Sequence, residues 1–169
     1  MVTVTTDGIV LEMTDPAQLV PSRRRPDLVL DEVPASAGAR IGSLYRDIWG
    51  PLGGGGRSDW TDEQWVAELN QPGMTAWIAH LANNDVGMAQ IGWSGRGDAG
   101  FTVVGVVPAL QGQGVGGDLV TRLTALMWQT PAPNGRPTQR VWLWTVPDEH
   151  PHTIPNYLAR GFVRGPDID

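Results

Sequence analysis

The segment from Val103 to Val120 has the residue types and the spacing of a phosphate-binding turn. A valine-rich run ends at Pro108, and apolar residues at helical spacing follow from Leu119 onward. Between these two runs lie four glycines, Gly112, Gly114, Gly116 and Gly117. A strand that passes through such a turn into a helix leaves backbone N–H groups pointing outward, where the helix dipole adds positive potential. The pattern therefore predicts a site for a phosphate or pyrophosphate that needs no basic side chain.

The residues around these glycines argue against two common phosphate sites. The chain contains no lysine, so it lacks the Gly-x4-Gly-Lys-Ser/Thr sequence of a P-loop. Gly112, Gly114 and Gly117 satisfy the Gly-x-Gly-x-x-Gly spacing of a dinucleotide-binding turn. However, the acids that follow the next expected strand, Asp148 and Glu149, come later than the roughly twenty residues which that fold requires.

Two motifs together resemble the GNAT superfamily of N-acetyltransferases. Val106-x-Pro108-x-x-Gln111-Gly112-x-Gly114-x-Gly116 is similar to the acyl-CoA-binding motif of that family. Tyr157-Leu-Ala-Arg-Gly161-Phe162 is similar to its Tyr-x-x-x-Gly-Phe motif, in which Gly161 suits a left-handed helix cap and Phe162 a hydrophobic anchor. The resemblance covers roughly residues 74 to 164. It implies an α/β (α+β) fold with a mixed, mostly antiparallel sheet and helices on both faces.

The resemblance also implies a site for acetyl-CoA as co-substrate. The backbone N–H groups from Gln113 to Gly117 would hold the pyrophosphate, and the main chain of Val106 and Val107 would pair with pantetheine. Gly105 is a candidate bulge residue that separates this strand from its neighbour, and the N–H near Val107 would polarise the thioester carbonyl. The candidate cofactor-binding residues are Val106, Val107, Gln111, Gly112, Gln113, Gly114, Val115, Gly116, Gly117 and Asn156.

The candidate catalytic residues are Tyr157 and His150. The family places its tyrosine hydroxyl near the CoA sulfur, so Tyr157 is the candidate general acid; the alternative is a tyrosine that only packs the last helix. The strand Phe101 to Val107 carries no acid, and Gln90 stands where related sequences often have one. His150 or His152 is a candidate base. The alternatives are that these histidines only shape the loop and that an ordered water relays the proton.

Composition limits the class of protein. The 169 residues, 41 % of them hydrophobic and 18 % charged, fit a single globular domain spanning 1–169. The net charge of −6 argues against a nucleic-acid partner, and no apolar run has the length of a membrane span. We therefore expect a soluble, cytoplasmic protein. The 22 glycines, 14 prolines, 12 arginines and absence of lysine indicate the GC-rich coding bias of a bacterial source. There is no cysteine. His80 has no metal-ligand spacing with a second residue, so no metal is expected.

Periodicity and turn residues predict the order of elements. Strands are expected near 28–30, 77–81, 86–93, 101–107 and 140–146 and after Phe162, and helices over 36–49, 61–70, 112–129 and 152–160. Ser36 is a candidate N-cap, Thr61 to Gln64 form a capping box, and Asn83 to Asp85 form a turn. Residues 8 to 14 form only a short apolar segment.

The functional prediction is direct transfer of an acetyl group from acetyl-CoA to the amine of a small molecule, with no covalent enzyme intermediate because no cysteine is present. Two alternatives stay open: the same fold repurposed for acyl-CoA decarboxylation or biosynthetic tailoring, and a non-catalytic acyl-CoA-binding protein.

A homodimer is possible. Arg23 to Arg25 form either a solvated turn or a contact to the 3′-phosphate of CoA. Six tryptophans are candidates for an acceptor pocket, although most of them are expected in the core: Trp49, Trp60, Trp65, Trp93, Trp142 and Trp144.

Overall fold

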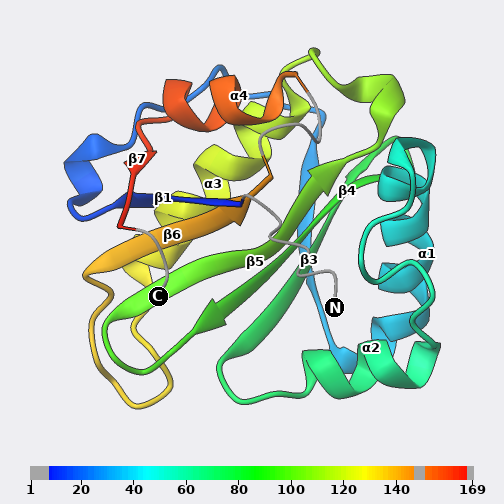
Figure 1. The fold of residues 1–169 in the computed structure, drawn as a ribbon, viewed down its shortest axis with the longest axis horizontal. Helices are drawn as coiled ribbons and strands as arrows, with labels where there is room; N and C mark the ends of the chain where they lie inside the picture. The colour runs from blue at the N-terminus through cyan, green and yellow to red at the C-terminus, as the bar shows by residue number, and fades with distance from the viewer. Residues whose placement is uncertain (1–7, 147–150, 167–169) are drawn as a thin grey trace, which may run out of the picture.

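A seven-stranded sheet forms the centre of the molecule, in the order β2-β3-β4-β5-β6-β1-β7 (Figure 1). The computed structural model describes residues 8–146 and 151–166. The strands are β1 Ile9–Met13, β2 Val29–Val33, β3 Met74–Leu81, β4 Asn84–Trp93, β5 Asp98–Val106, β6 Arg140–Thr145 and β7 Val163–Arg164. All neighbouring strands are antiparallel except β5 and β6, which are parallel.

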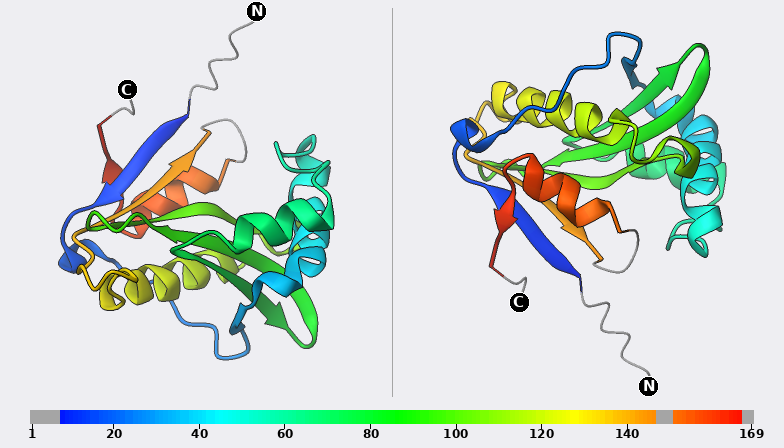
Figure 2. Two further views of the ribbon diagram at one scale, coloured as in Figure 1. Left: turned by 90° about the horizontal axis from the view of Figure 1, so that it is seen from below. Right: turned by 90° about the horizontal axis from the view of Figure 1, so that it is seen from above.

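Helices cover both faces of the sheet, as Figure 2 shows. The α-helices are α1 Gly38–Trp49, α2 Asp62–Leu69, α3 Val115–Gln129 and α4 Thr153–Ala159. Helices α1 and α2 bury one core against residues of β3 and β4 such as Ile78 and Met88. Helix α3 buries the other core against alternate residues of the same strands, such as Ala79 and Ala89. The predicted mixed sheet with helices on both faces is confirmed.

The parallel strands β5 and β6 separate after a short contact. They pair only from Asp98 to Phe101 on β5, whereas β5 stays paired with β4 as far as Val106. Along the β4–β5 ladder Gln90 faces Val103 but the next residue, Ile91, faces Phe101, so Thr102 is the extra residue of a β-bulge. The prediction of a bulge at Gly105 is therefore wrong.

Gly105 serves instead for the close approach of α1. A Cβ atom there would lie 2.7 Å from the ring of Trp49, so any side chain would push the helix away from β5. This contact depends on how α1 crosses the sheet, and the sequence around Gly105 carries no sign of it.

Strand β1 was not predicted, and it joins the C-terminal half of the sheet. It pairs with β6 over Ile9–Met13 and with β7 through Leu11 and Glu12. Its apolar residues Val10, Leu11 and Met13 are buried. A five-residue apolar segment alone does not reveal a partner more than 120 residues away, because strand pairing at that distance is decided by the assembled sheet.

Of the capping and turn residues predicted from the sequence, some lie where they were expected and others do not. The capping box of Thr61 and Gln64 is present at the start of α2, as predicted. Ser36 does not cap α1, because a 3-10 turn over Ala35–Ala37 precedes the helix and Ala37 takes the cap position. The β3–β4 turn lies at Ala82 and Asn83, which have φ of 46° and 69°, rather than at Asn83 to Asp85. Within the described residues no helix has the length and apolar character of a membrane span.

An ion pair fastens the start of α1 to the β3–β4 hairpin. Arg40 donates from Nε and Nη2 to the two carboxylate oxygens of Asp85, at 2.8 and 2.7 Å. These hydrogen bonds from Arg40 lower the pKa of Asp85 below its ordinary value. A carboxylate whose pKa is lowered by folding stabilises the protein at neutral pH, and this stabilisation is lost as pH falls through the lowered value.

We predict that Asp85→Asn lowers the free energy of unfolding at about pH 7 by roughly 0.5 to 1 kcal/mol, since the pair is partly exposed and screened by solvent. Urea unfolding of both proteins should show this difference shrinking as pH falls below about 4, the ordinary pKa of an aspartate. Asp47→Asn, at an exposed position on α1, is the matched control and should show neither effect. A difference that stays constant with pH would contradict the prediction.

Candidate functional site

A cleft of about 920 Å³ opens where β5 and β6 separate. One wall is β5 with the loop between α1 and α2, and the other is the end of β6 with α4. The glycine-rich turn and the first residues of α3 close one end. Its lining includes Arg57, Phe101, Val104, Val106, Gly112, Gly114, Gly116, Trp144, Asn156, Tyr157 and Arg160.

The glycine-rich turn presents unpaired backbone N–H groups at the start of α3. Gly112 and Gly114 have φ of 75° and 83°, a conformation that side chains other than glycine rarely adopt. Gln111 donates its backbone N–H to Pro108, and Asp118 donates its own to Gly114. Within the described part of the chain, the backbone N–H groups of residues 112–117 donate to no acceptor. An anion at this end would therefore meet free donors and the positive end of a fifteen-residue helix.

A buried ion pair holds this turn in place. The carboxylate of Asp118, 1 % exposed, accepts from Arg122 Nε at 2.9 Å and Nη2 at 2.6 Å. It also accepts from the backbone N–H of Arg25 at 2.9 Å, and Arg25 Nη1 donates to the carbonyl of Gln113 at 3.3 Å. Of the three arginines Arg23 to Arg25, Arg25 thus holds the turn in position through hydrogen bonds to Asp118 and Gln113, a role that the sequence did not indicate.

Arg160 adds positive charge beside the turn. Its Nη1 would lie 3.4 Å from a Cβ atom placed on Gly117, which locates the guanidinium next to the first turn of α3. Its Nε is buried and makes no hydrogen bond to any described residue. An unsatisfied buried donor is costly, so its position beside free backbone donors marks a place where an anion would be stabilised.

The predicted binding residues separate into two groups. Those that line the cleft are Val106, Gln111, Gly112, Gly114, Gly116, Gly117 and Asn156. Gln113 is exposed and its side chain bonds to Ala109, while the side chain of Val115 is buried in the core; only their backbone N–H groups remain available to a ligand.

Val107 does not face the cleft. Its backbone N–H donates to the carbonyl of Val86 on β4 at 2.8 Å, so it cannot polarise a ligand in the cleft as predicted. Because backbone groups alternate sides along an antiparallel ladder, Val104 and Val106 turn theirs toward the cleft. The carbonyl of Val106 already accepts from Gln111 Nε2 at 3.2 Å. The strand edge open to a ligand is therefore Val104 and the N–H of Val106.

Tyr157 and Asn156 of α4 face the glycine-rich turn across the cleft. Tyr157 is buried, packs edge-on against Phe162 at 6.2 Å between ring centroids, and lines the cleft. A Cβ atom on Gly116 would lie 3.7 Å from Asn156 Nδ2. His152 also lines the cleft, whereas His150 lies outside the described residues. The roles of Tyr157, His150 and Asn156 stay predictions.

The far end of the cleft is built around Arg57, which the sequence did not indicate. Arg57 Nη1 donates to Oε1 of the fully buried Gln90 at 3.1 Å, and Gln90 Nε2 donates to Glu68 Oε1 at 2.8 Å. Of the tryptophans considered for a pocket, Trp49 and Trp144 line the cleft, while Trp60 and Trp65 pack against the guanidinium of Arg57.

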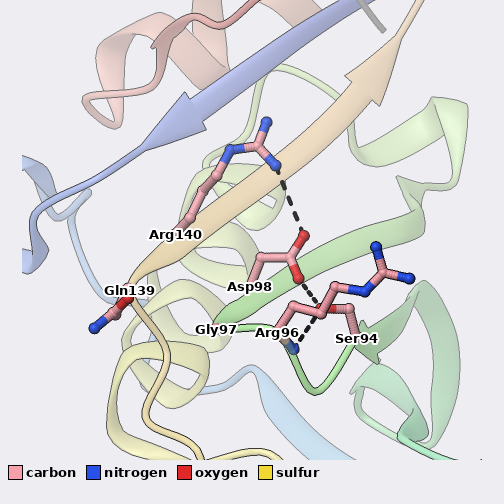
Figure 3. A pocket seen from close by; sticks show the side chains of 6 residues that line it. All are labelled: Ser94, Arg96, Gly97, Asp98, Gln139 and Arg140. Carbon is pink, nitrogen blue, oxygen red and sulfur yellow. Dashed lines mark hydrogen bonds and ion pairs between the residues drawn. The ribbon is translucent and has the colours of Figure 1, made fainter. Parts of the chain in front are cut away.

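A second, smaller hollow of about 340 Å³ lies at the start of β5 and β6 (Figure 3). Two of its three charged side chains, Arg140 and Asp98, form ion pairs or hydrogen bonds, and the third, Arg96, is exposed. Arg140 and Asp98 point toward each other at 3.8 Å, Arg140 also pairs with Glu12, and Asp98 bonds to Ser94. No group of three or more metal-ligating side chains occurs among the described residues. The large cleft is therefore the candidate active site.

Comparison with known proteins rests on structure alone, because no family model and no curated protein matches the sequence. A GCN5-related N-acetyltransferase from Sphaerobacter thermophilus superposes with a TM-score of 0.71 and 14 % identity, over 94 % of this chain and 48 % of that one. A functionally unknown conserved protein from Staphylococcus epidermidis gives 0.70 and 16 %, over 94 % and 57 %. This chain thus spans about half the length of those two proteins.

A shorter neighbour is covered almost completely. An aminoglycoside acetyltransferase from an uncultured soil metagenomic sample superposes with a TM-score of 0.65 and 14 % identity, over 84 % of this chain and 95 % of that one. Identities this low establish the fold and nothing finer. The chain has the fold of the GNAT acetyltransferases, as its two motifs predicted.

Proposed function

We propose that this protein is a GNAT-superfamily N-acetyltransferase, which moves an acetyl group from acetyl-CoA directly to the amine of a small molecule. The observation that carries the proposal is the run of unpaired N–H groups at residues 112–117, which opens on the same cleft as Tyr157. The structural neighbours that are named acetyltransferases support acyl transfer in general.

An acyl-CoA would place its phosphates and its pantetheine amides against separate parts of the cleft. Its pyrophosphate would bind the backbone N–H groups of residues 112–117 and the side chain of Arg160. The pantetheine amides would pair with Val104 and the N–H of Val106, as an added strand does along an open sheet edge. The thioester would then lie farther along β5, toward Phe101. The thioester supplies an activated acyl carbon and a thiolate leaving group.

The protein contributes orientation and a proton. The acceptor amine attacks the thioester carbonyl carbon, a C–N bond forms, and the C–S bond breaks. Tyr157 gives its hydroxyl proton to the departing sulfur, and the proton of the amine leaves to water or to a histidine of the β6–α4 loop such as His152. Holding both reactants along one wall makes the step effectively unimolecular. With no cysteine in the chain, the acyl group passes directly between substrates.

The binding half of the proposal is tested by Gly116→Asp. Gly116 faces the cleft with room for a side chain, because its nearest neighbours would lie 3.7 Å from an added Cβ. An acid in the first turn of α3 favours the helix dipole, so the fold should keep or gain stability. The same charge repels the pyrophosphate, and acetyl-CoA affinity in calorimetric titration should fall by at least about tenfold.

Gly116→Ala is the matched control for that experiment, since it adds a side chain without a charge. Its affinity for acetyl-CoA should stay within about threefold of wild type. Equal affinities for Gly116→Asp and Gly116→Ala would mean that no anion binds at this turn, and the proposed function would fail.

The catalytic half is tested by Tyr157→Phe. Loss of a general acid should lower kcat for CoA release by about a hundredfold or more. The KM for acetyl-CoA should change little, because the hydroxyl acts on the leaving sulfur rather than in binding. Thermal unfolding of the variant, with and without acetyl-CoA, checks that fold and binding survive. CoA release without any amine, or an unchanged kcat, would instead favour a repurposed enzyme or a different acid.

A further inference from the structure

Arg57 is fixed in position at the end of the cleft farthest from the glycine-rich turn. Its guanidinium carbon lies 4.5 Å above the ring centroid of Trp60 and 5.4 Å from that of Trp65. Its backbone N–H donates to the Tyr45 hydroxyl at 3.3 Å, and Nη1 donates to Gln90 Oε1. The loop carrying it is thus fastened to α1, α2 and β4, so that little rotamer freedom would be lost when the guanidinium binds a ligand.

The partner of Arg57 is a neutral amide held by a carboxylate. Gln90 Nε2 donates to Glu68 Oε1 at 2.8 Å, which turns Gln90 Oε1 toward Arg57. Glu68 Oε1 forms a long ion pair with Arg57 Nη1 at 3.7 Å, beyond the roughly 2.7 to 2.9 Å of a charge-assisted hydrogen bond. Both side-chain contacts of the guanidinium therefore use Nη1, and its other nitrogens have no acceptor among the described residues.

The guanidinium is open to the cleft. A guanidinium carries five N–H donors, and the side-chain hydrogen bond found for Arg57 within the described ranges uses one nitrogen, Nη1. The side chain is 22 % exposed and lines the cleft. A carboxylate entering from the cleft would find both charge and donors there.

The charged residues of the cleft lie at its two ends. Among the described residues that line it, Arg57 and Arg160 are the charged ones and none is Asp or Glu. Arg160 stands beside Gly117 at the phosphate end. Arg57 is held by Gln90, which faces Val103, three residues before Val106 and therefore about 10 Å along the strand. One arginine thus suits the phosphates and the other suits the acceptor.

We propose that the acceptor is an amine that carries a carboxylate, as in an amino acid, and that Arg57 binds this carboxylate and orients the amine toward the thioester. The inference rests on the proposed acetyl transfer. The described lining of the cleft holds two arginines and no carboxylate. It therefore disfavours polycationic acceptors such as polyamines and aminoglycosides.

The test compares matched amines that differ only at the carboxyl group. The full chain is assayed for CoA release with the common amino acids and with their primary amides, and with spermidine as a polycation. Wild type should prefer an acid over its amide by at least about tenfold in kcat/KM. Arg57→Gln should abolish this preference, mainly by raising KM for the acid more than KM for the amide.

Two further variants separate recognition from structure. Arg57→Lys keeps a cation on the tryptophans but lacks the planar fork, and it should retain only part of the preference. Arg96→Gln removes an exposed arginine at the second hollow and should leave the preference intact. Thermal unfolding of the CoA-loaded proteins with acid and with amide gives the same comparison without turnover, since a bound ligand raises stability.

The outcomes distinguish the two proposals. Acetyl-CoA binding with turnover of amides or spermidine as fast as of acids would overturn the carboxylate inference and leave acetyl transfer standing. A preference for acids that persists in Arg57→Gln would overturn the assignment to Arg57. No binding of acetyl-CoA would overturn acetyl transfer. No stabilisation of the CoA-loaded wild type by any acid would overturn the carboxylate inference.

Discussion

The separation of β5 from β6 is the constraint on which the site depends. Two parallel strands that stayed paired to their ends would satisfy each other's backbone groups and leave no open edge. Here pairing stops at Phe101, where the bulge at Thr102 bends β5 away while β4 continues to hold it. Thr102 Oγ1 donates to the carbonyl of Gln90 at 3.1 Å and so bridges the bulge to β4. Beyond this bulge the edge of β5 that faces β6 has no strand partner among the described residues, and the cavity lies beside it.

At each end of the cleft, an acidic side chain that is bonded to another residue holds the cleft-lining groups in position. Asp118 is an acid in the first turn of α3, close to where an anion would bind, and Arg122 neutralises it. At the other end Glu68 holds Gln90, and Gln90 in turn holds Arg57. The acids serve as supports behind the surface, whereas the groups that face the cleft are backbone donors and two arginines. This arrangement gives the cleft a positive character although the whole chain has a net charge of −6.

The sequence predicted those features that are encoded within a few residues. Residues within the segment itself determine the turn from Pro108 to Gly117 and the capping box at Thr61. Their positions could therefore be predicted from residue spacing. Strand β1, the bulge at Thr102 and the role of Arg57 did not follow, because each depends on partners from distant segments. Arg57 is an isolated arginine after a run of glycines, and only the folded chain brings it to Gln90 and Trp65. Val107 shows the same limit within a correctly predicted motif, since the ladder with β4 decides which way its N–H points.

The neutral side chain at Gln90 bears on how an acceptor amine would lose its proton. A carboxylate at this position would pair with Arg57 and repel Glu68, so the amide is the residue that keeps Arg57 available. The same choice removes a potential base from the strand. If the proposed acceptor binds beside Arg57, the guanidinium would compensate in part, because a positive charge destabilises the ammonium form of a neighbouring amine and raises its reactive neutral fraction. Recognition of a carboxylate and a larger neutral fraction of the acceptor amine would then both depend on Arg57, whereas an acid in place of Gln90 would take up the charge of that arginine.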